Sequence, residues 1–99
     1  MNDNPDKPID VTEARRQVVA AAVGEIRRRE GLLSRLEQLD ESVIVAALRT
    51  FEFPDGAAGW LICPAYGLGG AIPVDVAETA EGRGRVLWVL NCIEYNIPL

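Results

Sequence analysis

The stretch from residue 60 to residue 82 constrains the fold most, because its prolines and glycines decide where helices end and begin. We expect a helix over residues 57–63, capped by Asp55 after the turn at residues 51–56. Pro64 should end this helix, because a proline disfavours the helical region at the residue before it.

Three glycines follow closely, Gly67, Gly69 and Gly70, and they allow backbone conformations that other residues avoid. Pro73 then suits the first turn of a helix, and Thr79 suits the N-cap of the next one. The bend also carries large apolar side chains, Trp60, Leu61, Leu68 and Ile72. A solvated loop would not carry them, so we expect the bend to lie on the protein core or on a partner.

The N-terminal part predicts a leader followed by helix. Residues 1–9 are polar, contain two prolines and predict a mobile leader. Residues 10–40 are mostly strong helix formers, but a break near Gly31 is expected because a glycine costs about 1 kcal/mol relative to alanine. Apolar residues on this segment recur at helical spacing and form one stripe, Val19, Ala22, Ile26, Leu33 and Leu36.

Two further helices are expected. Asp40 or Ser42 should cap a helix that holds Val43, Ile44, Ala47, Leu48 and Phe51, although residues 43–45 are β-branched and also suit a strand. Residues 80–95 should form the last helix, with Val86, Val89, Leu90 and Ile93 on its buried face. The fold class is therefore all-α: a small single-domain helical bundle of four to six helices, with the glycine-rich bend between the last two main helices. Residues 1–9, 10–40 and 41–99 form its leader, N-terminal segment and main body, the last two in one compact unit.

Composition limits the classes of function. No run approaches the roughly 20 apolar residues of a membrane span, and the first residues carry no signal core, so we expect a cytoplasmic protein. Cys63 and Cys92 lie among apolar residues and should be buried free thiols. Without histidine or further thiols, a zinc site of usual composition cannot be assembled, and no cofactor is expected.

Catalysis is not predicted. The absence of histidine removes the commonest general base and every Ser-His or Cys-His pair. Asp75, Glu78 and Glu81 are close in sequence, but at these positions they more simply complement helix dipoles. The glycine bend lacks the lysine and the Ser/Thr of a phosphate-binding loop, so the sequence indicates a protein that is not an enzyme.

The bend and the last helix resemble the toxin-binding domain of the MbcA/ParS/Xre family of bacterial antitoxins over roughly residues 43–97. The residues that carry the resemblance are Trp60, Leu61, Pro64, Leu68, Gly70, Pro73, Asp75, Thr79 and Gly82, followed by Val86, Leu90, Ile93, Glu94 and Tyr95. Two features depart from the family pattern: Ala65 stands where many members have asparagine, and the chain has little room for an upstream helix-turn-helix.

The resemblance implies an antitoxin of a type II toxin-antitoxin system. Its partner would be a RES-type toxin, an enzyme that consumes NAD or transfers ADP-ribose from it, and its C-terminal region would cover the toxin's active-site cleft. The residues expected to bind the toxin are Trp88, Glu94, Tyr95, Asn96, Ile97, Pro98 and Leu99. Residues 50–99 carry a net charge of −4, which suits a basic partner. For Trp88 the more usual explanation is additional core, and a partner anchor is the alternative.

Two alternatives remain. Residues 15–35 carry a net charge of +4, and a DNA-binding regulator would use its arginines on phosphates, namely Arg15, Arg16, Arg27, Arg28 and Arg29. Glu25 and Glu30 can pair with these arginines instead and leave a solvated helix face. The second alternative is a helical dimerisation module using the apolar stripe, which is compatible with an antitoxin that forms a homodimer.

Overall fold

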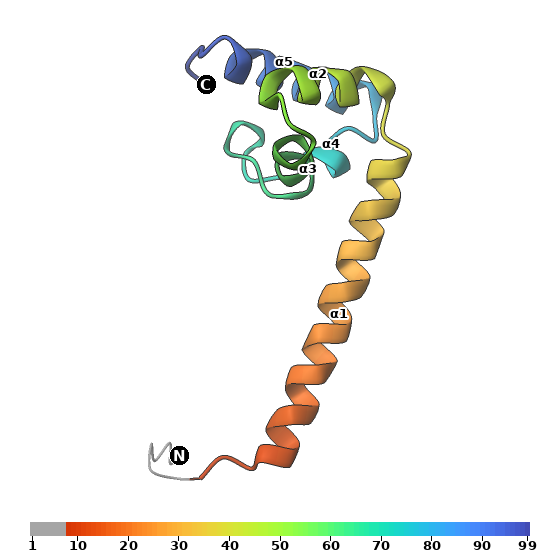
Figure 1. Cartoon of the computed structure of the whole chain (residues 1–99), viewed down its shortest axis with the longest axis vertical. Helices are drawn as coiled ribbons and strands as arrows, with labels where there is room; N and C mark the ends of the chain where they lie inside the picture. Colours follow the sequence, from red (N-terminus) through yellow and green to blue (C-terminus); the bar gives the residue numbers. More distant parts are fainter. Residues whose placement is uncertain (1–7) are drawn as a thin grey trace. The chain divides into compact units, whose positions relative to one another are not determined.

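The computed structural model describes residues 8–99 and is helical throughout (Figure 1). The leader expected over residues 1–9 falls largely outside these residues. The elements are α1 (Val11–Glu37), α2 (Glu41–Phe51), α3 (Pro54–Ile62), the 3₁₀ turn η1 (Tyr66–Leu68), α4 (Pro73–Val76) and α5 (Ala80–Glu94). Within residues 8–99 there are five α-helices and no strand, which confirms the all-α prediction.

The chain divides into two units between Glu30 and Gly31. Of the first unit, the structure describes residues 8–30, which are exposed or half-exposed along α1. The second unit, Gly31–Leu99, contains the last turns of α1 and all the other helices.

The expected break near Gly31 is wrong, because α1 continues through it to Glu37. The cost of one glycine is about 1 kcal/mol, which strong helix formers on either side outweigh. After the glycine, Leu32 is buried in the core of the second unit and holds the last turns of the helix in place.

At the start of α2 the N-cap is Asp40, one of the two predicted candidates. The Asp40 carboxylate accepts a hydrogen bond from the backbone N–H of Ser42 at 3.1 Å and another from the Ser42 hydroxyl. Both bonds stabilise the charged carboxylate and lower the pKa of Asp40 below its ordinary value, and the bond from the hydroxyl has the larger effect. Residues 43–45 are therefore helical, and their β-branched side chains do not produce a strand.

The start of α3 differs from the prediction. The helix begins at Pro54, with Phe53 at the N-cap and no side-chain capping bond, and Asp55 lies inside its first turn. Proline at the first helical position has its φ already set for helix and has no N–H to satisfy. Cys63 is the C-cap residue, immediately before Pro64 as predicted.

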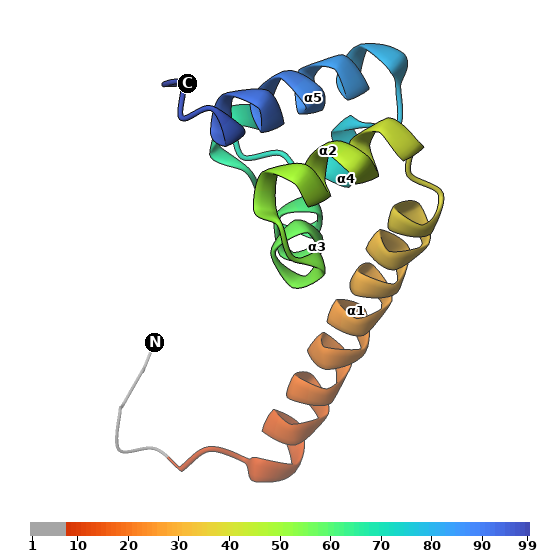
Figure 2. The same cartoon turned by 45° about the horizontal axis from the view of Figure 1, so that its top comes forward.

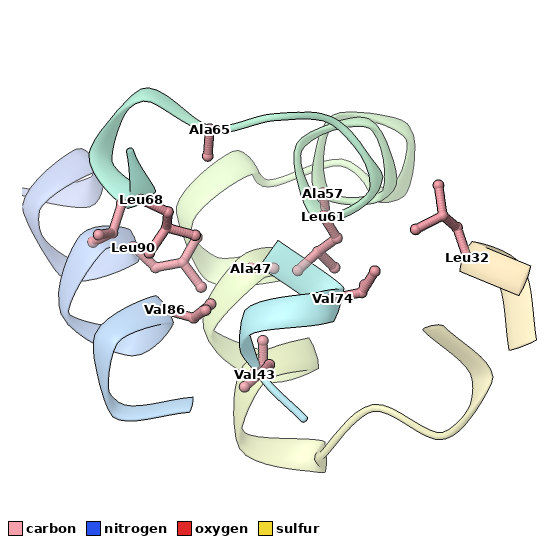
Figure 3. Packing of buried hydrophobic residues seen from close by; sticks show 12 residues of the cluster. Leu32, Val43, Ala47, Ala57, Leu61, Ala65, Leu68, Val74, Val86 and Leu90 are labelled. Carbon is pink, nitrogen blue, oxygen red and sulfur yellow. The ribbon is translucent and has the colours of Figure 1, made fainter. Parts of the chain in front are cut away.

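The core of the second unit lies between α2 and α5, which run side by side, with α3, η1 and α4 closing it (Figure 2). Side chains from every one of these elements meet there, including Val43, Ala47, Leu61, Leu68, Val74, Val86 and Leu90 (Figure 3). Burying each larger side chain contributes about 1.5–3 kcal/mol, so this cluster is the main source of the unit's stability.

The apolar stripe predicted on residues 10–40 is mostly solvent-exposed. Val19, Ile26 and Leu33 are exposed, and only Leu36 packs partly against the core. The buried residue is Leu32, one position before Leu33 and therefore about 100° around the helix. Spacing identified an apolar face but not the face that the core covers.

Candidate functional site

The glycine-rich bend between α3 and α4 is closed by its own backbone. The N–H of Ala65 donates to the carbonyl of Ala71 at 3.0 Å, and the N–H of Gly70 donates to the carbonyl of Ala65 at 2.9 Å. Gly69 and Gly70 have φ of +66° and +85°, a region that L residues other than glycine rarely adopt. Ala65 is buried and anchors the bend on the core.

The four large apolar side chains named for this stretch lie in or against the core, which was one of the two predicted locations. Leu61 and Leu68 are buried, and Ile72 packs against them while partly exposed. Trp60 packs on Phe51, with ring centroids 5.9 Å apart and the planes tilted by 37°. Of the other motif residues, Pro64, Gly70, Asp75 and Thr79 are exposed.

Asp75 and Glu78 form ion pairs with one arginine. Arg35 Nη1 lies 3.2 Å from Asp75 Oδ1, and Arg35 Nε lies 3.0 Å from Glu78 Oε1. These bonds join the end of α1 to α4 and to the turn that follows it. All three side chains are about half exposed, so the pairs orient the elements more than they stabilise the fold.

Thr79 and Gly82 set the start of α5. The Thr79 hydroxyl oxygen accepts a hydrogen bond from the N–H of Gly82 at 3.0 Å, which confirms Thr79 as N-cap. A Cβ on Gly82 would lie 1.7 Å from the carbonyl oxygen of Val76, so only glycine fits there. Pro73, at the first position of α4, is buried.

The outer side of α5 is exposed and aromatic. Trp88 is 58% exposed and Tyr95 is 65% exposed. The two residues are seven positions apart and so lie on one side of the helix, whereas Val86, Val89 and Leu90 on the other side are buried. The core interpretation of Trp88 is therefore wrong, because the helix turns this residue away from the packed face.

Residues 96–99, called the tail below, reverse direction after α5. Asn96 has φ of +56°, its N–H donates to the carbonyl of Ile93 at 3.2 Å, and the N–H of Ile97 donates to the carbonyl of Cys92 at 2.8 Å. These two bonds with a left-handed residue between them form a Schellman motif. Ile97 and Leu99 remain about half exposed.

A family model described as the antitoxin Xre/MbcA/ParS C-terminal toxin-binding domain matches residues 46–95, half of the chain. The chain belongs to this antitoxin family. A toxin-binding domain implies a cognate toxin as its partner. No curated protein and no solved structure matches this chain.

The matched region of the antitoxin runs from α2 to the C-cap of α5 and contains the whole bend. Within it, Thr79 caps the start of α5, and Gly82 allows this start to pass close to the Val76 carbonyl. The tail and α1 lie outside the matched region, so the tail's part in toxin binding stays a prediction.

Glu94 lines a small cavity on the surface between α2 and α5. The cavity has a volume of about 190 Å³ and is also lined by Arg49, Thr50, Asn91 and Tyr95. Thr50 donates from its hydroxyl to the carbonyl of Ala46 at 2.8 Å and to that of Leu90 at 3.4 Å, which links the two helices. Glu94 is half-buried, and within residues 8–99 it forms no ion pair.

Three arginines of α1 pair with glutamates of the same helix. Arg16 Nη1 lies 2.9 Å from Glu13, and Arg28 and Arg29 both pair with Glu25. The hydrogen bond from Arg28 is the main cause that lowers the pKa of Glu25. Of the five predicted DNA contacts, three thus pair with carboxylates, while Arg15 and Arg27 are exposed on the same helix.

The cysteines differ. Cys92 is buried as predicted, but Cys63 is exposed, because as the C-cap residue of α3 it leaves the helix before its side chain reaches the core. Neither forms a disulfide. Within residues 8–99 no group of three or more metal-ligating side chains is found, and no helix there is long and apolar enough to cross a membrane.

Sequence reasoning missed two elements of the scaffold, Arg35 and Leu32. Arg35 looked like one more member of a basic segment, and its acidic partners lie some forty residues away in sequence. A weak signal was present: α4 and the turn after it carry two carboxylates that nothing nearby in sequence neutralises.

Proposed function

We propose that this antitoxin binds a RES-type toxin, an enzyme that consumes NAD or transfers ADP-ribose from it, and blocks its active-site cleft. The observation that carries the proposal is the exposed apolar set on α5 and the tail, Trp88, Tyr95, Ile97 and Leu99. A domain of a toxin-binding family that leaves two aromatic residues in water on one helix has a suitable anchor for its partner.

Charge supports the same surface. Glu94 is free of ion pairs within residues 8–99 and lies between Trp88 and Tyr95 in sequence. Arginines that bind the phosphates of NAD would accept a carboxylate in their place, because both groups present paired acceptor oxygens to a guanidinium. Pro98 completes the proposed contact and lowers the entropy lost when the tail is ordered. Asn96 takes part through its left-handed backbone turn and not through its side chain.

The test is to express the product of the neighbouring gene as the candidate RES-type toxin and to measure whether increasing amounts of the chain inhibit its consumption of NAD. We expect full inhibition near one equivalent, with Trp88→Ala weakening it at least tenfold, as loss of a central aromatic anchor does. Phe53→Ala is the matched control, because Phe53 is an aromatic residue outside α5 that is 69% exposed, against 58% for Trp88. NAD loss that continues with excess wild-type chain would refute the proposal.

A shortened chain tests the tail separately. A chain ending at Tyr95 keeps the matched region and both exposed aromatic residues but lacks residues 96–99. We expect it to fold and to inhibit more weakly than the full chain. Undiminished inhibition would exclude the tail from the contact while leaving toxin binding intact.

Self-association through α1 is a second proposal, supported by the exposed apolar residues Val18, Val19, Val23 and Ile26 in the first unit. Light scattering tests it: a homodimer should be measured for the wild type and a monomer for Ile26→Glu, because a charge replaces an apolar contact.

DNA binding by the α1 arginines is the alternative use of this helix, tested by titrating the chain with its own promoter at low salt.

A further inference from the structure

The tail rests on the glycine-rich bend. A Cβ built on Gly67 would lie 2.8 Å from Cδ1 of Leu99 and 2.9 Å from Cγ1 of Val89. Real Cβ atoms do not approach carbon this closely, so the missing side chain of Gly67 provides the space that both residues use. Leu99 is therefore docked on the domain although half of its surface faces solvent.

A second device holds the same segment from the helix side. The Schellman motif requires Asn96 in the left-handed region, and its bond from Ile97 to the Cys92 carbonyl turns the chain back toward Val89. Asparagine tolerates this conformation better than most residues, whereas a β-branched residue there is strongly strained. The turn at Asn96 and the space at Gly67 thus act on the tail from its two ends.

We propose that Gly67 and Asn96 are positioning residues for toxin binding: they hold the tail docked in the free protein, in the arrangement that the toxin recognises. This inference rests on the proposed function, in which the tail contacts the toxin. A tail already docked loses less conformational freedom on binding, and the measured affinity scales with the fraction of molecules in the competent arrangement.

Docking is measured first in the free chain, where no toxin is needed. Nuclear Overhauser effects between the methyl groups of Leu99 and Val89, and slow exchange of the Ile97 amide hydrogen, report a docked tail. Gly67→Ala should abolish the methyl contact, and Asn96→Val should abolish both signals. Gly59→Ala is the matched control for the first variant, because a Cβ at Gly59 meets nothing within 4 Å. If the wild-type protein shows neither the methyl contact nor the slow amide exchange, the proposal is overturned.

Binding is measured next, as inhibition of the RES-type enzyme used above. Asn96→Val should weaken inhibition about tenfold, the size expected for strain in the left-handed region. Asn96→Gly should keep both the docking signals and the inhibition, because glycine adopts this φ freely. Gly67→Ala should also weaken inhibition by more than any loss of thermal stability explains, which Gly59→Ala controls.

The outcomes separate the two proposals. A wild-type chain with a docked tail and no inhibition refutes the proposed function. Inhibition that is unchanged or stronger when Asn96→Val has released the tail overturns the positioning role, because the toxin then prefers the free tail. Asn96→Gly with a docked tail but weakened inhibition also overturns it for Asn96, whose side chain would then contact the toxin directly.

Discussion

Helices α1 and α5 carry apolar residues at the same helical spacing, yet they use them in opposite ways. In α5, Val86 and Leu90 are buried against α2, whereas in the first unit Val18 and Ile26 of α1 are exposed. Spacing therefore indicates that a helix has an apolar face, and only the tertiary structure decides whether the same chain covers it. The difference gives α5 one buried and one exposed side, whereas the apolar residues of α1 in the first unit are exposed.

The largest difference is expected for one substitution made in each helix. Gly82→Ala should destabilise the second unit by about 3 kcal/mol or more, because its Cβ would overlap the Val76 carbonyl, which cannot move cheaply. Gly24→Ala should instead stabilise α1 by up to about 1 kcal/mol, because a Cβ there meets nothing within 4 Å and alanine favours helix. Thermal unfolding followed by circular dichroism measures both. Equal effects would remove the distinction between the helices.

A second pair tests burial directly. Val86→Ala should cost about 2 kcal/mol of unfolding free energy, because it removes two buried methyl groups and leaves a cavity. Val18→Ala should change stability by less than about 0.5 kcal/mol, because its side chain is exposed. Urea unfolding at several protein concentrations compares them. A loss for Val18→Ala that grows with concentration would show that a second chain covers α1.

Acid should act on α2 through its cap. The pKa of Asp40 is lowered in the folded protein by its hydrogen bonds from Ser42. The contribution of this cap to the free energy of unfolding is therefore fully present above the pKa that Asp40 has in the unfolded chain. It is then lost as the pH falls through the folded pKa. We expect wild-type stability to fall in this range, and Asp40→Asn, which still caps, to show a weaker pH dependence. Acid titrations of the wild type and of Asp40→Asn, monitored by circular dichroism, measure the difference. The same pH dependence in both proteins would show that the charge of the cap does not contribute to stability.

The smallest effect concerns reactivity. A thiol reagent should modify Cys63 in the native protein and Cys92 only after unfolding, because the first is exposed and the second is buried. Mass spectrometry before and after denaturation counts one and then two modified thiols. Prompt modification of Cys92 would indicate that α5 opens readily.

Much of the fold follows from local chemistry. The Asp40 and Thr79 caps, the stop at Pro64 and the start of α4 at Pro73 depend on residues within a few positions of one another, and all were predicted correctly. The break at Gly31 was not, because a local preference of about 1 kcal/mol yields to the rest of the helix.

What could not be predicted depends on residues far apart in sequence. Arg35 meets Asp75 and Glu78, and Gly67 accommodates Leu99, only after the chain has folded. The exposure of Trp88 has the same origin, because α2, α4 and η1 pack on the side of α5 that holds Val86, Val89 and Leu90. For the candidate site, the sequence therefore supplied its residues but not the docked arrangement of its tail.

The two indoles of this antitoxin report on different parts of the molecule. Trp60 is partly shielded and packs on Phe51, while Trp88 lies in water on the back of α5. Their fluorescence should therefore consist of a shorter-wavelength and a longer-wavelength component. A toxin that covers α5 would shift only the emission of Trp88 to shorter wavelength. The unchanged emission of Trp60 would then serve as the reference for that shift.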